Sequence, residues 1–111
     1  RNQSDERWAR EIAANVRGAE IVMYSTQSCI YCARARAWLD THRIAFTECD
    51  IERNSACLAR YQALGAQGTP TFDVRGVRLL GFSPQDVAEA LRHPAPGATP
   101  NPTAAGSGAQ P

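Results

Sequence analysis

Two cysteines separated by two residues, Cys29 and Cys32, come shortly after the apolar, β-branched segment Glu20–Ser25. That segment predicts a buried strand, and residues 29 to 41 predict a helix for which Ser28 is a possible N-cap. Both sulfurs then lie in the first turn of a helix that follows a strand. The arrangement favours a fold that alternates strands and helices. It also makes dithiol redox chemistry the leading interpretation, ahead of half a metal site or inert core thiols.

The hydrophobic pattern extends this alternation in both directions along the chain. Trp8, Ile12 and Val16 recur every four residues and predict an amphipathic helix over residues 4–17, with Ser4 as a possible cap and Gly18 as a possible stop. Downstream, we expect a strand at 44–50, a helix at 54–64 ended by Gly65, strands at 71–74 and 77–80 joined by a turn at Arg75-Gly76, and a last helix that opens at Pro84 and places Val87 and Leu91 on one face.

This order predicts an α/β fold with a mixed four-stranded sheet between helices, a three-layer α/β/α sandwich. The first two strands form a parallel pair through a crossover helix, and the last two form an antiparallel hairpin. With 111 residues the chain has room for one domain. We expect that domain at residues 19–93, an N-terminal helical extension at 1–18, and a disordered tail rich in Pro, Ala and Gly at 94–111.

Composition excludes several classes of partner. The 12 basic residues, all of them arginine, balance 11 acidic residues. No run of like charge resembles a nucleic-acid or membrane patch, and no stretch is apolar enough to span a bilayer. We expect a monomer. The chain begins at Arg1 rather than Met, which suggests that a segment preceded it; the bacterial cytoplasm and the periplasm or cell envelope both remain open as locations.

The chemistry of the cysteine pair follows from its place at a helix start. The unpaired N–H groups there stabilise an anion, so the pKa of Cys29 is expected in the range of about 3.5–7.5 instead of about 8.5. Cys29 is thus the predicted nucleophile and Cys32 the resolving thiol. A zinc site would need a second, closely spaced ligand pair, and Cys49 and Cys57 are eight residues apart.

Two further motifs stand near strand or helix boundaries. Thr69-Pro70 precedes the third strand, and a cis bond there would present the Thr69 backbone to an extended cysteinyl peptide. Gly81-Phe82-Ser83 leads into Pro84, so the last helix begins with another set of free N–H groups, with Ser83 as its N-cap.

In order and spacing, residues 19–92 resemble the glutaredoxin branch of the thioredoxin fold, and are similar to bacterial glutaredoxin-domain proteins of the cell envelope. The resemblance implies dithiol–disulfide exchange and no tightly bound cofactor, with glutathione as the co-substrate. The lysine that many members carry before the first cysteine is Thr26 here, and the helix position that commonly meets the glycyl carboxylate of glutathione falls on Cys57. Arg60 or Arg34 could supply the missing charge. The implied glutathione-binding positions are Thr26, Tyr31, Cys57, Arg60, Thr69, Pro70, Gly81, Phe82 and Ser83.

The expected function is reduction of protein disulfides or glutathione mixed disulfides through the dithiol. Two alternatives remain open. The segment Leu80–Asp86 resembles redoxins that serve ribonucleotide reductase, for which the donor is thioredoxin reductase in place of glutathione. The other alternative is a glutathione-dependent [2Fe–2S] cluster between two subunits, since Ile30 stands where many dithiol members have proline.

The remaining cysteines are expected to be unpaired. Cys49 falls in the second strand and is predicted to be a small core residue. Cys57 lies one turn into the following helix, and we expect it on the rim of the active-site groove as a third thiol.

Overall fold

The computed structural model describes residues 3–17 and 20–96. Gly18 and most of the predicted tail, residues 97–111, lie outside these ranges. The elements are α1 (Gln3–Asn15), β1 (Ile21–Ser25), α2 (Ile30–Thr41), β2 (Thr47–Asp50), α3 (Ser55–Ala63), β3 (Thr71–Val74), β4 (Val77–Leu80) and α4 (Pro84–Arg92). This is the order that the sequence predicts, so the α/β class is confirmed.

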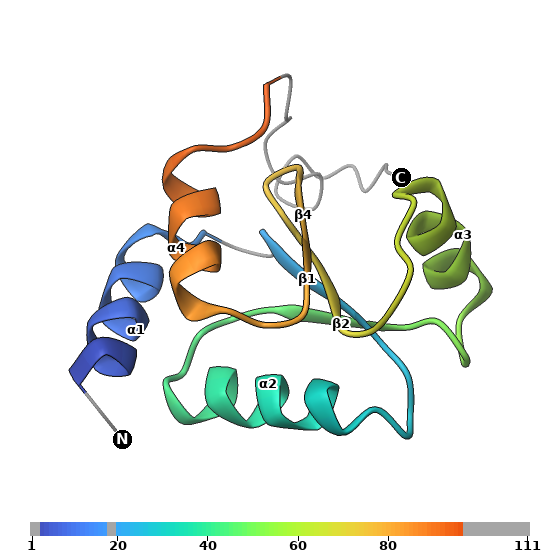
Figure 1. The fold of residues 1–111 in the computed structure, drawn as a ribbon, viewed down its shortest axis with the longest axis horizontal. Helices are drawn as coiled ribbons and strands as arrows, with labels where there is room; N and C mark the ends of the chain where they lie inside the picture. The colour runs from blue at the N-terminus through green and yellow to red at the C-terminus, as the bar shows by residue number, and fades with distance from the viewer. Residues whose placement is uncertain (1–2, 18–19, 97–111) are drawn as a thin grey trace.

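The sheet has the strand order β2-β1-β3-β4. β1 pairs in parallel with β2 and antiparallel with β3, and β3 pairs antiparallel with β4, as Figure 1 shows. The β3–β4 hairpin turns at Arg75 and Gly76, with φ values of 51° and 88°. Positive φ at both central residues suits a two-residue hairpin, because its twist then matches that of the strands.

Alternate residues of β1 pack into two separate clusters on opposite faces of the sheet, which makes three layers. Ile21 and Met23 join the main core with residues of α1, α2, β3 and α4. Val22 and Tyr24 point to the other face and join a smaller cluster with residues of β2 and α3. The helices α2 and α4 therefore cover one face and α3 covers the other.

The leading helix α1 is part of the main core. Ile12 is fully buried, and Trp8 and Val16 pack against the same cluster from partly buried positions. At the surface, Glu11 forms an ion pair with Arg92 of α4. Helix α1 therefore covers α4 and extends the layer that α4 belongs to (Figure 1).

Local predictions at three element ends are wrong. β2 begins at Thr47, and Ile44 precedes it: Arg43 adopts φ of 57° at the end of α2, and the Ile44 N–H bonds back to the carbonyl of Leu39. Ile44 is thus buried because the chain reverses at the end of α2, and it does not pair with another strand. Ser4 lies inside α1 and does not cap it. The N-cap of α2 is Cys29, not Ser28.

Within the described ranges, no helix combines the length and apolar character needed to cross a membrane.

Candidate active site

Cys29 occupies the N-cap of α2, where its extended backbone (φ −83°, ψ 109°) begins the helix. Its Sγ accepts a hydrogen bond from the backbone N–H of Cys32 at 3.0 Å. The sulfur itself therefore performs the capping role usually taken by a hydroxyl or carboxylate oxygen. In the reduced protein the same N–H and the positive end of the helix would stabilise a Cys29 thiolate.

Cys29 and Cys32 form a disulfide, with their Cα atoms 5.2 Å apart. The two sulfurs differ in access: Cys29 is half-buried and Cys32 is fully buried. An external disulfide or thiol can thus reach Cys29 first. The predicted order, with an accessible nucleophile and a shielded resolving thiol, fits this geometry.

The turn before β3 lies at the end of the sheet where β1 leads into the loop that carries Cys29. The Thr69–Pro70 bond is cis, as predicted. In the antiparallel register Tyr24 pairs with Thr71, so the residue before Thr71 lies alongside the end of β1, from which the chain continues toward Cys29. Pro70 is buried and Thr69 is half-buried.

The segment before α4, residues 81–83, lies at the same end of the strands. The Gly81 N–H donates to the carbonyl of Pro70 at 2.8 Å, and Gly81 adopts φ of 78°. Ser83 caps α4 by accepting from the Asp86 N–H, with Pro84 in the first turn, as predicted. The side chain of Phe82 is half-buried and packs against the main core.

Three apolar side chains are exposed near these segments, and for one of them, Leu80, the sequence predicts no role in the site. Ile30 is 57% exposed, Tyr31 63% and Leu80 72%. Ile30 and Tyr31 lie between the two cysteines, and Leu80 pairs with Thr71 and lies beside Gly68 in the Pro70 turn. The Arg34 guanidinium stands 5.5 Å from the centroid of the Tyr31 ring. The residue after the reactive cysteine and the next one thus expose apolar surface, and a cation lies over the second of them.

A polar network behind the site joins α2 to the ends of β1 and β2. Arg36 forms an ion pair with Glu48, and the buried Ser25 hydroxyl donates to the Glu48 carboxylate at 2.7 Å. Hydrogen bonding by Arg36 holds the pKa of Glu48 below its ordinary value of 4.5, against the effect of desolvation. The network fixes α2 on the sheet one turn after Cys32.

Replacing Glu48 by glutamine tests this network. Because the folded-state pKa of Glu48 is lowered, its charge stabilises the fold above about pH 4.5 and that contribution is lost as the pH falls through the folded pKa. Arg36 is 38% exposed, so solvent screens the pair, and we expect a loss of about 1 kcal/mol at pH 7. Urea unfolding at pH 7 and pH 3 should show the difference only at pH 7. Glu89→Gln, on the exposed face of α4, is the control; equal effects of both substitutions would contradict the assignment.

The loop before Cys29 is held by the loop that follows β2. The Gln27 N–H donates to the Glu52 carboxylate at 3.0 Å, and the Gln27 side chain donates to Asp50. Desolvation raises the pKa of Asp50, but hydrogen bonds from the N–H groups of Glu52 and Arg53 and from Gln27 lower it below its ordinary value overall. Nothing in the local sequence indicates this contact, since it joins two loops 25 residues apart in the chain.

The expectation for Cys57 is wrong. Cys57 is 4% exposed and forms a disulfide with Cys49, so it is neither a free thiol nor a residue of the groove rim. Cys49 is buried, as predicted, but is also oxidised. Arg60 turns toward this disulfide, with Nη2 3.3 Å from the Cys49 sulfur. The Cys57 side chain is therefore not placed to meet a glutathione carboxylate, whereas Arg60 stays exposed.

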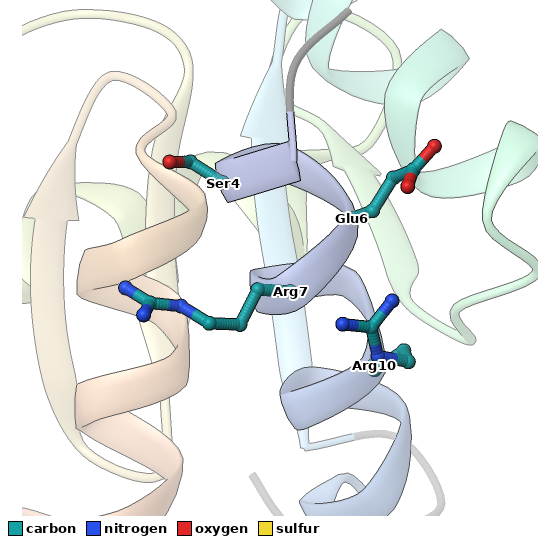
Figure 2. A pocket seen from close by; sticks show the side chains of 4 residues that line it. All are labelled: Ser4, Glu6, Arg7 and Arg10. Atoms are coloured by element: carbon teal, nitrogen blue, oxygen red, sulfur yellow. The ribbon is translucent and has the colours of Figure 1, made fainter.

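Neither a metal-binding cluster nor a second hollow adds to the site around Cys29 in the part of the chain that the structure describes. No three acidic, histidine or cysteine side chains in the described ranges gather in a way that could hold a metal ion. Figure 2 shows a hollow on the surface of α1, lined by Ser4, Glu6, Arg7 and Arg10. Arg7 lies over the ring of the neighbouring Trp8, and α1 stands at the opposite end of the molecule from the start of α2 (Figure 1).

Comparison with known proteins agrees with this geometry. The family model of glutaredoxin matches residues 21–78. The glutaredoxin-like protein NrdH of Lactococcus lactis subsp. cremoris (strain MG1363) is 26% identical over 69 residues, which cover 62% of this chain and 96% of that protein.

Solved structures share the fold. The thioredoxin-like protein BC3987 aligns with a TM-score of 0.56 and 23% identity, over 62% of this chain and 96% of that one. The holo form of glutaredoxin C1 from Populus tremula x tremuloides aligns with a TM-score of 0.50 and 18% identity, over 84% of this chain and 90% of that one. These likenesses show a thioredoxin-like fold.

Proposed function

Because this chain belongs to the glutaredoxin family, we propose that it is a thiol–disulfide oxidoreductase that reduces disulfides through Cys29 and Cys32. The observation that carries the proposal is the position of the pair. The half-buried Cys29 sulfur caps a helix and accepts an N–H bond, and its disulfide partner is fully buried.

The exchange follows from this difference in access. The Cys29 thiolate attacks one sulfur of a substrate disulfide, a Cys29–substrate bond forms, and the other substrate sulfur leaves and takes up a proton. Cys32 then gives up its proton and attacks the Cys29 sulfur, which releases the second substrate thiol. Two electrons pass from the dithiol to the substrate, and an external thiol donor restores the pair.

The surroundings of Cys29 support protein substrates. Ile30, Tyr31 and Leu80 expose apolar surface that a polypeptide can cover. The cis Thr69–Pro70 turn leaves the Thr69 backbone at the end of β3, where a short extended segment could add to it. We propose protein disulfides as the main substrates and mixed disulfides with glutathione as further ones.

As electron donor, we propose that glutathione is weak and a thioredoxin-reductase-type enzyme is stronger. By resemblance, the glycyl carboxylate of glutathione would meet the position of Cys57, which is closed in a buried disulfide. Nη2 of the exposed Arg60 contacts the same disulfide, and the Arg34 guanidinium lies over the ring of Tyr31, between the two cysteines. A charge-assisted hydrogen bond of about 1.5–3 kcal/mol is thereby lost for glutathione.

A coupled assay compares the two donors. The oxidised protein is incubated with insulin and NADPH, with either glutathione and glutathione reductase or thioredoxin reductase, and insulin reduction is followed. We expect turnover with thioredoxin reductase and slower turnover with glutathione and glutathione reductase, because one lost bond of this size weakens glutathione binding at least about tenfold. Equal rates would contradict the donor proposal, and no turnover with either donor or with dithiothreitol would contradict the function. A brown preparation with visible absorbance would instead indicate an iron–sulfur cluster.

A further inference from the structure

A second disulfide lies on the far face of the sheet from α2. It joins Cys49 of β2 to Cys57 of α3, with Cα atoms 5.4 Å apart. Among the nine residues of α3, all of them described, Cys57 alone is buried. Tyr61 adds a partly buried ring that packs on Tyr24. Because a helix with one buried residue gains little from packing, this covalent bond is a major part of its attachment to the sheet.

The sulfurs of this disulfide are shielded from solvent. Cys49 and Cys57 are 3% and 4% exposed, and they pack with Tyr24 in the smaller cluster. Nη2 of Arg60 stands 3.3 Å from one sulfur and 3.9 Å from the other. Burial raises the pKa of the Tyr24 phenol, which Arg60 opposes, and this agrees with a closed environment. Because exchange requires an attacking thiolate to reach a sulfur, α3 must first move away from the sheet.

The disulfide also links the two ends of the segment 49–57, which holds the loop before Cys29. Residues 49–57 include Asp50 and Glu52, whose carboxylates hold Gln27, two residues before Cys29. The Ile51 N–H donates to the carbonyl of Ser25 at 3.0 Å, at the end of β1. If residues 49–57 became more flexible, the loop that leads to the nucleophile would therefore become more flexible too.

We propose that Cys49–Cys57 is a persistent disulfide that forms once, stays oxidised while Cys29–Cys32 cycles, and orders both α3 and the active-site loop. In forming it, the two thiols give up two electrons and two protons. A disulfide donor, either a protein disulfide or oxidised glutathione, takes up both as its own S–S bond breaks to two thiols. The chain therefore matures fully only under oxidising conditions.

Counting reduced thiols in the wild-type protein tests persistence. The folded, oxidised protein is treated with stoichiometric dithiothreitol, quenched with acid, unfolded and alkylated with iodoacetamide, and the labelled cysteines are identified by peptide mass spectrometry. We expect label on Cys29 and Cys32 only, and on all four cysteines when the reductant is added in denaturant. Label on Cys49 and Cys57 at the same rate as on the CxxC pair, or before any reduction, would overturn the proposal.

A double substitution, Cys49→Ala with Cys57→Ala, tests the ordering role. We expect a fall in Tm of about 10–20 °C, faster amide hydrogen exchange in α3, and a changed alkylation rate of reduced Cys29. Gln27→Ala is the matched control: it removes the side-chain bond to Asp50, keeps the backbone N–H that donates to Glu52, and should alter only the Cys29 rate. An unchanged Tm and unchanged exchange in α3 would overturn the proposal. If the double variant does not fold, the thiol count in the wild-type protein still decides the question.

Discussion

Replacing Cys29 by serine is expected to reduce the rate of disulfide reduction by about a thousandfold or more, to the background of the uncatalysed exchange. Serine preserves the shape of the N-cap and can still accept the Cys32 N–H, so the fold should not change. The loss would therefore report on the nucleophile alone. Circular dichroism and Tm serve as the control for folding, and insulin reduction with dithiothreitol measures the rate.

Replacing Cys32 by serine separates the two steps. Cys29 can still attack a substrate disulfide, but no thiol follows to resolve the product, so a mixed disulfide should accumulate and be visible by mass spectrometry. A small external thiol should release it and give partial turnover. Equal partial losses in the Cys29 and Cys32 variants would contradict the assigned roles.

The rate at which iodoacetamide alkylates Cys29 should rise with pH as the thiol loses its proton. The helix N-terminus and the N–H donated by Cys32 stabilise the thiolate, so the alkylation rate of the reduced protein should reach half its maximum clearly below pH 8.5, the value of about 8.5 being that of a free thiol. A midpoint at or above the free-thiol value would show that burial outweighs the helix.

The features that the sequence predicts well depend on neighbours in the chain. The strand before Cys29, the helix after it and the turn at Arg75-Gly76 are each specified within a few residues, and all three are present. Errors at element ends have the same origin. At Ile44, an apolar residue next to a strand is buried by the chain reversal at Arg43 instead of by strand pairing, and hydrophobicity alone does not distinguish these two.

The parts of the site that the sequence does not predict depend on contacts between distant segments. Whether Cys49 and Cys57 meet is decided by which face of β2 carries Cys49 and by how α3 lies on that face. In β2 the neighbours of Cys49 are exposed or half-buried, so the strand turns a single sulfur toward α3. A spacing of eight residues across a strand-to-helix turn is the indication that the sequence offers, and it does not distinguish a bonded pair from the two separate thiols that we predict. The clamp of Gln27 by Asp50 and Glu52 has no indication in the local sequence.

Helix α1 is the other place where a local pattern has a larger consequence than its position suggests. The four-residue spacing predicts an amphipathic helix, and the structure shows what its apolar face covers. Ile12 is fully buried in the cluster that also holds Val87 and Leu91 of α4. The residues before β1 thus complete the core of the domain.

Replacing Ile12 by alanine is therefore expected to lower the free energy of unfolding by about 2–5 kcal/mol, since it removes three buried carbons and leaves a cavity between α1 and α4. For a domain of this size the Tm should fall by about 10 °C or more. Glu11→Gln is the control: it removes only the ion pair with Arg92, whose side chains are 27% and 35% exposed, and should cost about 1 kcal/mol or less. Reduced Cys29 should alkylate at the wild-type rate in both variants at temperatures where they are folded, because α1 lies at the far end of the molecule from α2's first turn. A change in Tm for Ile12→Ala no larger than that for Glu11→Gln would mean that α1 is dispensable, and that the core closes without it.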